Sequence, residues 1–510
     1  MSLGTLSSRF LGLFREMLLA ALFDRMVTDA WSAAFKIPNL FRRLLGEGSL
    51  SVSFQPVLIE AQNEDQKNST QKATELSDTL HAFLIGLLLL LTVLGVLFSH
   101  EILGFILDAD YVARTEAFEL TVRLAKIMFG FLFFICLFAY YMAILNANGF
   151  FGWAAVAPVF FNISLIISTL LPQNILSTRG DFLAWGVLLG GFLQMAVMIP
   201  PLLKAGLFPK FQYHFRNPQF LKVLRNMIPG FFGLGLAQIT VLVNMGFASS
   251  LGEGVISYIA WADRLLELPL SLISVSLGTA LLPTLSQYWA QGDQKGMAEN
   301  SERFLSLNLF LSSMAAVGLY VLAEPIVRLL FERGQFDYED SKGVILVVQI
   351  YAVAMIPISL VRVLAPSYYA VKNTWFPAVV SGICLVAHLL LAPLLMKDLG
   401  LQGLLYSSLI SAALNFLLLI MGYGWLITGF EWSSFLKKSV KVIVAALIMF
   451  GVMTEILKFL SDWPQSTLSW LAQVFSVGIF GIVIFFCVST LLKHQETKFI
   501  LNQFLKRLKR

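Results

Sequence analysis

Four charged side chains lie within one short apolar segment, "AFKIPNLFRRLLGEG" at residues 34–48. Three are basic, Lys36, Arg42 and Arg43, and the fourth, Glu47, is acidic. Guanidinium groups bind phosphate oxygens through pairs of hydrogen bonds, and lysine binds them as a point charge. The segment is therefore a candidate site for an anionic ligand.

Helical periodicity places most polar residues of this segment on one face. At about 100° per residue, a stripe roughly 90° wide contains Asp29, Ser32, Lys36, Asn39, Arg43 and Glu47. Arg42 lies about 100° away from that stripe. Pro38 frees a backbone carbonyl and bends the helix, so phase alone does not decide whether Arg42 or Arg43 faces inward.

Two further apolar segments carry intramembrane charge. Residues 3–24 contain Ser8, Arg9, Arg15 and Glu16, where Arg15 and Glu16 predict partial pairing.

The other charged segment, residues 255–286, includes "AWADRLLELP". Asp263 and Glu267 share a helix face, and Arg264 reaches Glu267 at the i, i+3 spacing, so a structural salt bridge is one interpretation.

Within the cluster of charges that these segments are expected to form, basic side chains outnumber acidic ones. Six basic side chains facing lipid would together cost on the order of 15 kcal/mol, so they must face water, counter-charges or the membrane interface. The acids that balance them are fewer, which favours an anionic over a cationic ligand. The two sets are Arg9, Arg15, Lys36, Arg42, Arg43 and Arg264 against Glu16, Asp29, Glu47, Asp263 and Glu267.

Composition indicates an integral membrane protein that is entirely α-helical. Of 510 residues, 57% are hydrophobic and 13% are charged, against about 25% charged in soluble domains. A spanning helix needs about 20 apolar residues, which predicts fourteen transmembrane helices. They are residues 3–24, 29–58, 78–99, 118–147, 153–172, 182–203, 220–249, 255–286, 302–324, 342–371, 376–396, 400–427, 438–460 and 468–492. The first, second and eighth are the weakest by hydropathy.

The distribution of basic residues predicts the orientation. Residues 204–226 and the tail at 506–510 are basic and contain no acid, which predicts a cytoplasmic position for both. Both termini are then cytoplasmic, although the cytoplasmic loop near residues 60–75 is not basic. No loop exceeds roughly twenty residues, so we expect no soluble domain.

Prolines near the boundaries of predicted spans recur at a spacing of about 220 to 230 residues. "NANGFFGWAAVAP" ends at Pro158 and "YYAVKNTWFP" ends at Pro377, while Pro56 and Pro283 end the second and eighth spans. This predicts two six-helix lobes in parallel repeat, the plan of transporters whose substrate site lies between halves. The lobes are residues 1–205 and 206–427, and residues 428–510 add two helices and a basic cytoplasmic tail.

Other classes of site have weak support. Three cysteines and five histidines are scattered without metal-ligand spacing, and no P-loop occurs. We therefore expect no metal, no cofactor and no catalytic residues, and the basic ends indicate membrane orientation rather than nucleic-acid binding.

Three segments together resemble the MurJ/MviN family of lipid II flippases, in the multidrug/oligosaccharidyl-lipid/polysaccharide exporter superfamily. They are "SSRFLGLFREMLLAALFDRMVTDAWSAAFKIPNLFRRLLGEGSLSVSFQPVLIE", "IAWADRLLELPLSLISVSLGTALLPTLS" and "RVLAPSYYAVKNTWFP". The resemblance runs over nearly the whole chain. It differs at Glu16, where relatives often have Asp.

The resemblance implies a bacterial inner-membrane transporter that moves lipid II, an undecaprenyl-diphosphate disaccharide-pentapeptide, to the periplasmic leaflet for cell-wall synthesis. It implies alternating access around a cationic cavity, with the last two helices forming a groove for the polyprenyl chain. Contacts with membrane lipids and with the cell-wall synthesis machinery would follow. Coupling to a monovalent cation gradient or to the membrane potential stays open.

The family motif assigns roles to individual residues. Its important arginines match Arg9, Arg15, Arg42 and Arg264, and Ser8, Asp29 and Glu47 match other motif positions. Periodicity favours Arg43 where the motif favours Arg42. We expect Lys36, Asn39 and Arg43 to contribute to binding, and Asp29, Glu47, Glu16, Asp263, Glu267 and Pro38 to act in gating or charge balance.

Two other functions fit parts of the sequence. A drug or cation exporter of the same superfamily usually has twelve spans and relies on buried carboxylates. A membrane-embedded glycosyltransferase acting on the same lipid would need a carboxylate with a metal or general base, and the acidic loop around Asp108 and Asp110 has no metal-like cluster.

Overall fold

The computed structural model describes residues 2–44, 50–63, 69–172, 179–213, 217–426, 429–460, 462–498 and 500. These residues form helices joined by short connections, and none of them lies in a β-strand. The chain forms two compact units, Met1–Ser257 and Tyr258–Arg510. The predicted lobe boundary at residue 205 comes from the sequence repeat and stays a prediction.

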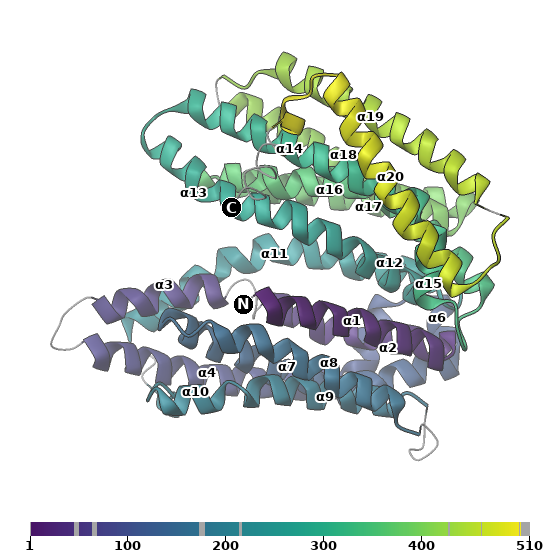
Figure 1. Ribbon diagram of the computed structural model, residues 1–510. Helices are drawn as coiled ribbons and strands as arrows, with labels where there is room; N and C mark the ends of the chain where they lie inside the picture. Colours follow the sequence, from purple (N-terminus) through teal and green to yellow (C-terminus); the bar gives the residue numbers. More distant parts are fainter. Residues whose placement is uncertain are drawn as a thin grey trace. The chain divides into compact units, whose positions relative to one another are not determined.

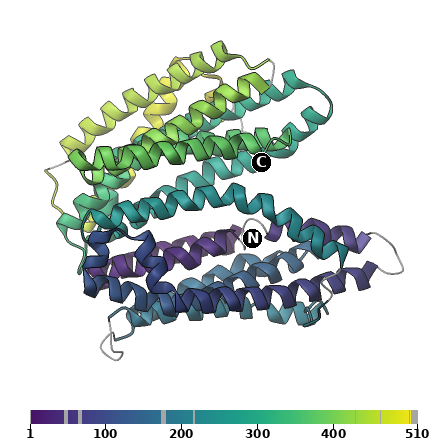
Figure 2. The same ribbon diagram turned by 180° about the vertical axis from the view of Figure 1, so that it is seen from behind.

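The first unit is built around α7, a 33-residue helix that packs against α2, α3, α4 and α9. Figures 1 and 2 show this unit from opposite sides. Its helices are α1 (Ser2–Leu22), α2 (Arg25–Phe41), α3 (Leu50–Asn63), α4 (Ser69–Leu97), α5 (Ser99–Ile106), α6 (Ala109–Ala113), α7 (Thr115–Ala147), α8 (Gly152–Leu170), α9 (Asp181–Ala196), α10 (Ile199–Lys204) and α11 (Pro218–Ser250).

Small residues bring α7 and α9 into close contact. A Cβ atom built on Gly191 would lie 2.6 Å from the Phe131 ring, and one on Gly130 would lie 2.6 Å from Leu188. Close approach of this kind is the usual basis of helix association in membranes, where apolar burial gives little driving force. The ion pair between Arg123 and Asp181, at 2.6 Å, fixes the same two helices at one end.

The second unit contains the remaining helices. They are α12 (Val255–Leu270, which begins in the first unit), the π turn η2 (Ser271–Val275), α13 (Ser276–Ala290), α14 (Gln294–Val321), α15 (Ala323–Phe331), α16 (Tyr338–Ala370), α17 (Trp375–Leu399), α18 (Leu401–Leu426), α19 (Trp432–Phe459) and α20 (Thr467–Leu491).

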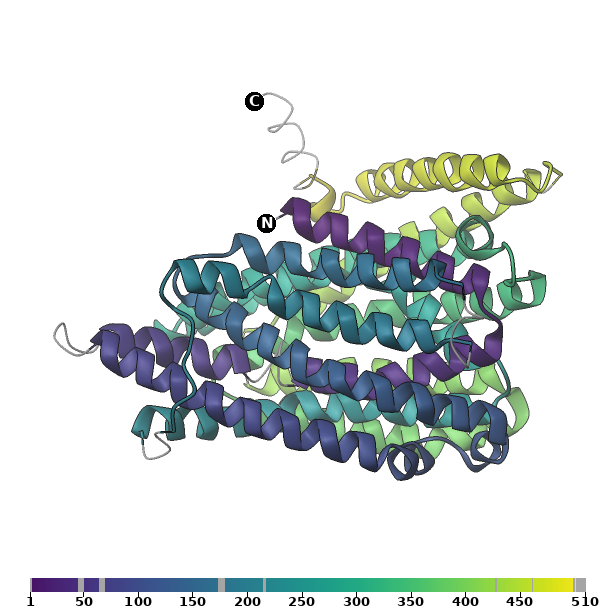
Figure 3. The ribbon, with the colours of Figure 1, turned by 90° about the horizontal axis from the view of Figure 1, so that it is seen from below.

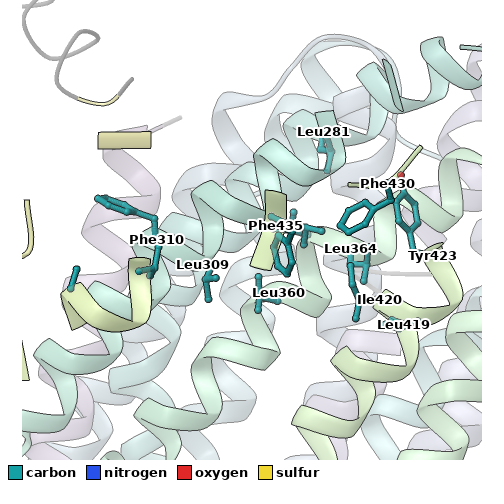
Figure 4. Close-up of a cluster of buried hydrophobic side chains, with 14 of the residues drawn as sticks. Leu281, Leu309, Phe310, Leu360, Leu364, Leu419, Ile420, Tyr423, Phe430 and Phe435 are labelled. Carbon is teal, nitrogen blue, oxygen red and sulfur yellow. The ribbon is translucent and has the colours of Figure 1, made fainter. Parts of the chain in front are cut away.

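Two helix pairs lie at the edges of this unit. Helix α17 pairs with α18, and α19 pairs with α20 (Figure 3). Between them a buried apolar cluster includes Phe310 of α14, Leu364 of α16, Tyr423 of α18 and Phe435 of α19 (Figure 4). This cluster is the core of the second unit.

Eleven helices in the described part of the chain are long and apolar enough to cross a membrane. They correspond to predicted spans 3–6 and 8–14. Spans 1, 2 and 7 are helical, as α1, α2 with α3, and α11, but are not among the eleven. The eighth span was predicted to be weak by hydropathy, and this was wrong because α12 to α13 is apolar enough over Val255–Ala290. The count of fourteen stays a prediction.

The second span is not one regular α-helix, contrary to prediction. The α-helix that contains Pro38 ends at Phe41, residues 42–44 have π-helical geometry, and α3 begins at Leu50. The eighth span continues as a helix over Val255–Ala290 but contains the π turn η2, which begins two residues after Pro269. Proline cannot donate the helical hydrogen bond, which favours an irregular turn nearby.

Candidate functional site

Arg15 lies buried where α1 packs on α8. Its Nη1 donates to Asn162 Oδ1 at 3.1 Å, and its Nη2 pairs with the carboxylate of Glu16. The guanidinium also lies 5.8 Å from the Phe161 ring centroid. The predicted pairing of Arg15 with Glu16 is confirmed, and Asn162 is an additional partner. This buried charge is therefore held by three side chains.

Ser8 belongs to the same cluster. Asn162 Nδ2 donates to the Ser8 carbonyl at 2.9 Å and to Ser8 Oγ at 3.2 Å. Asn162 thus connects Ser8 and Arg15, two turns apart on α1. Arg9, the other predicted arginine of this helix, is half-buried.

The candidate residues near the end of α2 differ in exposure. Pro38 is buried, Lys36 and Asn39 are half-buried, and Arg43 is exposed. Arg42 is half-buried and caps the helix, with its Nε donating to Asn39 Oδ1 at 2.7 Å. Glu47 lies outside the described residues.

The π geometry at residues 42–44 changes which residues share a helix face beyond Phe41. A π turn has more residues per turn than an α-helix, so it shifts the direction of every later side chain. The phase calculated for an unbroken α-helix therefore holds from Asp29 to Asn39 and not at Arg43. The structure gives Arg42 a fixed hydrogen-bond partner, while the role of either arginine in binding stays a prediction.

Asp29 caps the N-terminus of α12. Its buried carboxylate accepts hydrogen bonds from the Gly254 N–H at 2.5 Å, the Ser257 N–H at 2.8 Å and Ser257 Oγ at 2.6 Å. Ser257 Oγ also lies 2.9 Å from Thr28 Oγ1. A carboxylate at this position satisfies free helix N–H groups and interacts favourably with the helix dipole. Asp29 thus joins α2 to the chain segment that begins α12.

The charged residues of α12 are exposed. Arg264 Nη1 lies 3.2 Å from Glu267 Oε2, which confirms the pairing predicted from their spacing. Asp263 is exposed one residue earlier. These residues belong to the second unit, and their combined action with the arginines of the first unit stays a prediction.

The sequence did not predict three polar contacts of the first unit. Buried Arg25 donates to the Ala20 and Phe23 carbonyls at the end of α1, at 2.8 and 2.7 Å. Arg123 binds both carboxylate oxygens of Asp181. Asn162 was also missed, although an amide in the apolar run "AVAPVFFNISLII" is itself a signal, because a polar group at that depth needs a partner.

Among the described residues, no group of three or more His, Cys, Asp or Glu side chains is placed to hold a metal ion. The buried cysteines Cys136 and Cys384 are free thiols within apolar helices. Around the buried or half-buried arginines of α1 and the end of α2, the structure places the amide side chains of Asn162 and Asn39 and the carboxylate of Glu16.

The similarity to known proteins extends over almost the whole chain. The family model described as "Lipid II flippase MurJ" matches residues 18–485. A "Probable lipid II flippase MurJ" of Bdellovibrio bacteriovorus is 47% identical over 445 residues, covering 87% of this chain and 85% of the relative. The "Lipid II flippase MurJ" of Burkholderia cenocepacia is 33% identical, covering 88% and 87%.

Solved structures agree with these relatives. A structure titled "Lipid II flippase MurJ, inward closed conformation" has a TM-score of 0.76 at 26% identity, covering 100% of this chain and 99% of that one. An inward-facing multidrug resistance MATE transporter of the MOP superfamily has a TM-score of 0.67 at 16% identity, covering 82% and 93%, and shows the shared fold. The chain is therefore an integral membrane protein that belongs to the lipid II flippase MurJ family.

Proposed function

We propose that this protein is a transporter, not an enzyme, that moves lipid II from the cytoplasmic to the periplasmic leaflet of the bacterial inner membrane. The observation that carries this proposal is the family match over residues 18–485. The cationic character of α1 and α2 agrees with it, because lipid II carries a diphosphate between its lipid and its sugars. The function serves peptidoglycan synthesis.

The diphosphate is bound by the basic residues of the three charged segments. Arg9, Arg15, Arg42 and Arg264 are the principal cations, with Lys36, Arg43, Asn39 and Ser8 beside them. Asp29, Glu47, Glu16, Asp263 and Glu267 balance these charges and take part in gating, and Pro38 provides flexure.

Transport proceeds by alternating access between two lobes, residues 1–205 and 206–427. A ligand shifts a conformational equilibrium only by its differential affinity for the two states. Neutralisation of the basic cluster by the diphosphate supplies that difference and favours closure of the cytoplasmic gate. Residues 428–510 provide the groove for the polyprenyl chain.

The chain crosses the membrane fourteen times with both termini in the cytoplasm. It requires no cofactor for the transport step, and a monovalent cation gradient or the membrane potential supplies the energy. The substrate and the surrounding lipids are its principal partners, alongside contacts with the cell-wall synthesis machinery.

Substitution of the two adjacent arginines tests the cationic site. Arg42→Ala and, separately, Arg43→Ala are introduced into cells depleted of their own flippase. Loss of growth with Arg42→Ala supports the family motif, and loss with Arg43→Ala supports the periodicity. If both variants sustain growth at normal protein levels, the cationic site is not as proposed.

Two further assays separate this function from its rivals. A drug exporter would confer resistance in an efflux assay, and its depletion would leave lipid II translocation intact. A glycosyltransferase would convert lipid II to polymerised glycan when the purified protein is incubated with it. Loss of lipid II translocation on depletion, without either result, supports the flippase.

A further inference from the structure

Helices α19 and α20 form an apolar pair at the edge of the second unit, with many side chains exposed. Side chains such as Leu447 and Phe475 are 64% and 62% exposed. Lipid is as apolar as leucine, so the hydrophobic effect does not press such helices onto their neighbours. Their position must depend on close packing and on polar contacts.

A polar cluster holds the start of α20. Arg328 of α15 is 7% exposed, and its Nη2 lies 2.7 Å from Glu324 Oε1 of the same helix. Its Nη1 donates to Gln465 Oε1, just before α20, at 3.2 Å. One arginine therefore joins α15 to the entry of α20.

Two aromatic rings complete this cluster. The Arg328 Cζ atom lies 4.7 Å from the Tyr338 ring centroid of α16 and 5.1 Å from the Trp470 ring centroid of α20. A guanidinium near aromatic faces is stabilised by the ring quadrupole, most strongly where water is excluded. On its remaining side, Arg328 Nε lies 3.6 Å from Glu332 Oε2. We call Glu324, Arg328, Glu332, Tyr338, Gln465 and Trp470 the Arg328 clamp.

The opposite end of the pair has a second polar attachment. Glu302 of α14, 8% exposed, accepts from Ser434 Oγ at 2.8 Å and pairs with Lys438 Nζ at 3.0 Å, both on α19. Between the two ends the contacts are apolar, as between Phe310 and Phe485, whose ring centroids are 4.8 Å apart. Figure 4 shows Phe310 among the buried apolar side chains of the second unit.

Apolar attraction is non-directional, whereas ion pairs, hydrogen bonds to a guanidinium and cation–π contacts require a defined geometry. The polar ends therefore set the register of α19 and α20. We propose that Arg328 is a positioning residue that fixes α20, and through it the groove for the polyprenyl chain. This inference rests on the proposed function, since it assigns that groove to α19 and α20.

A distance measurement tests the structural half of the proposal. Cys136, Cys384 and Cys487 are replaced by alanine, and spin labels are attached at Lys342→Cys of α16 and Leu468→Cys of α20. We expect one narrow distance distribution in the parent protein and a broad one with Arg328→Gln. Arg333→Gln, which removes an exposed arginine of the α15–α16 connection, is the matched control and keeps the narrow distribution.

Trp470→Leu provides a second perturbation if Arg328→Gln folds poorly. It leaves Arg328 paired with Glu324 and removes only one aromatic face, so it broadens the distribution to a smaller extent. A narrow distribution in both Arg328→Gln and Trp470→Leu overturns the proposal.

A transport measurement tests the functional half. Proteoliposomes containing each variant are given lipid II with its full undecaprenyl chain and an analogue with a farnesyl chain too short to fill the groove. We expect Arg328→Gln to lower the ratio of long-chain to short-chain transport at least fivefold, and Arg333→Gln to leave it unchanged. An equal loss of both substrates shows general damage and overturns the positioning role.

Failure of the proposed function gives a different result. A parent protein that moves neither substrate overturns the flippase assignment and with it the chain-length role of Arg328. The spin-label distances still decide whether Arg328 holds α20, so the two failures are distinguishable.

Discussion

Replacing Asp29 should release the first turn of α12. In Asp29→Ala, the Gly254 and Ser257 N–H groups lose their acceptor, whereas the Ser257 hydroxyl keeps Thr28 at 2.9 Å. A buried donor without an acceptor costs about 1–3 kcal/mol, and loss of a negative charge at a helix N-terminus costs about 0.3–1 kcal/mol more. The sum is roughly 3 kcal/mol or more.

Asp29→Asn should be milder because its amide oxygen still accepts one or two of these hydrogen bonds. The negative charge is lost, and the amide N–H₂ group takes the place of a carboxylate oxygen opposite a hydrogen-bond donor. We therefore expect a destabilisation of about 1 kcal/mol. The two variants differ by roughly 2 kcal/mol, which corresponds to about a 30-fold difference in local opening.

Hydrogen exchange followed by mass spectrometry measures this effect directly. Peptides that cover residues 252–260 should exchange roughly 150-fold faster in Asp29→Ala, and about fivefold faster in Asp29→Asn. Asp24→Asn is the control, because Asp24 caps α2 through the Val27 N–H at 2.9 Å and makes no contact with α12 in the described residues. Unchanged exchange at residues 252–260 in Asp29→Ala would refute the capping role.

Three further outcomes follow from the geometry. Arg15→Ala should lower the free energy of unfolding by about 3–5 kcal/mol because it removes the cationic partner that the buried Glu16 carboxylate has in Arg15, and Arg15→Met with Glu16→Gln should recover part of that loss in thermal unfolding. Gly403→Ala should destabilise by about 1–3 kcal/mol, since its Cβ would lie 2.3 Å from the Leu395 carbonyl oxygen, whereas Gly451→Ala should be tolerated because nothing lies within 4 Å. Burial, together with Lys441 and Lys438, lowers the pKa of His494 to about 4, so the packing of residues 492–498 should be firm above pH 6.5 and loosen as the pH falls from 6.5 to 4, measured by hydrogen exchange and absent in His494→Gln.

The all-helical fold and the charged helices could be predicted from the sequence because both depend on local composition. Runs of apolar residues determine helix length in a membrane, and charge within them is costly wherever it lies. Short-range pairs were also predictable, since Arg264 and Glu267 are three residues apart on one helix and Arg15 and Glu16 are adjacent.

Long-range contacts could not be predicted in this way. Asp29 meets Ser257 across 228 residues of sequence, and Arg15 meets Asn162 across 147. Neither contact follows from helical periodicity, because periodicity relates only residues of the same helix. The π turn at residues 42–44 was missed for a different reason, because a single proline permits a bend, a break or a continuous helix.

The two π turns lie at similar places in the two segments that the predicted repeat pairs, at residues 42–44 and at Ser271–Val275. Helix α2 ends at Phe41 and α12 at Leu270, and the helices that follow begin at Leu50 and Ser276. Pro56 is then the seventh residue of α3, and Pro283 is the eighth of α13.

The two π turns do not separate the charged residues in the same way. Lys36 and Asn39 lie before the first turn, but Arg42 and Arg43 lie within it, whereas Asp263 and Arg264 both lie before the second. The parallel repeat of two lobes therefore stays a prediction. Such a repeat would place a π turn at the same point of both segments, which the proline spacing alone does not predict.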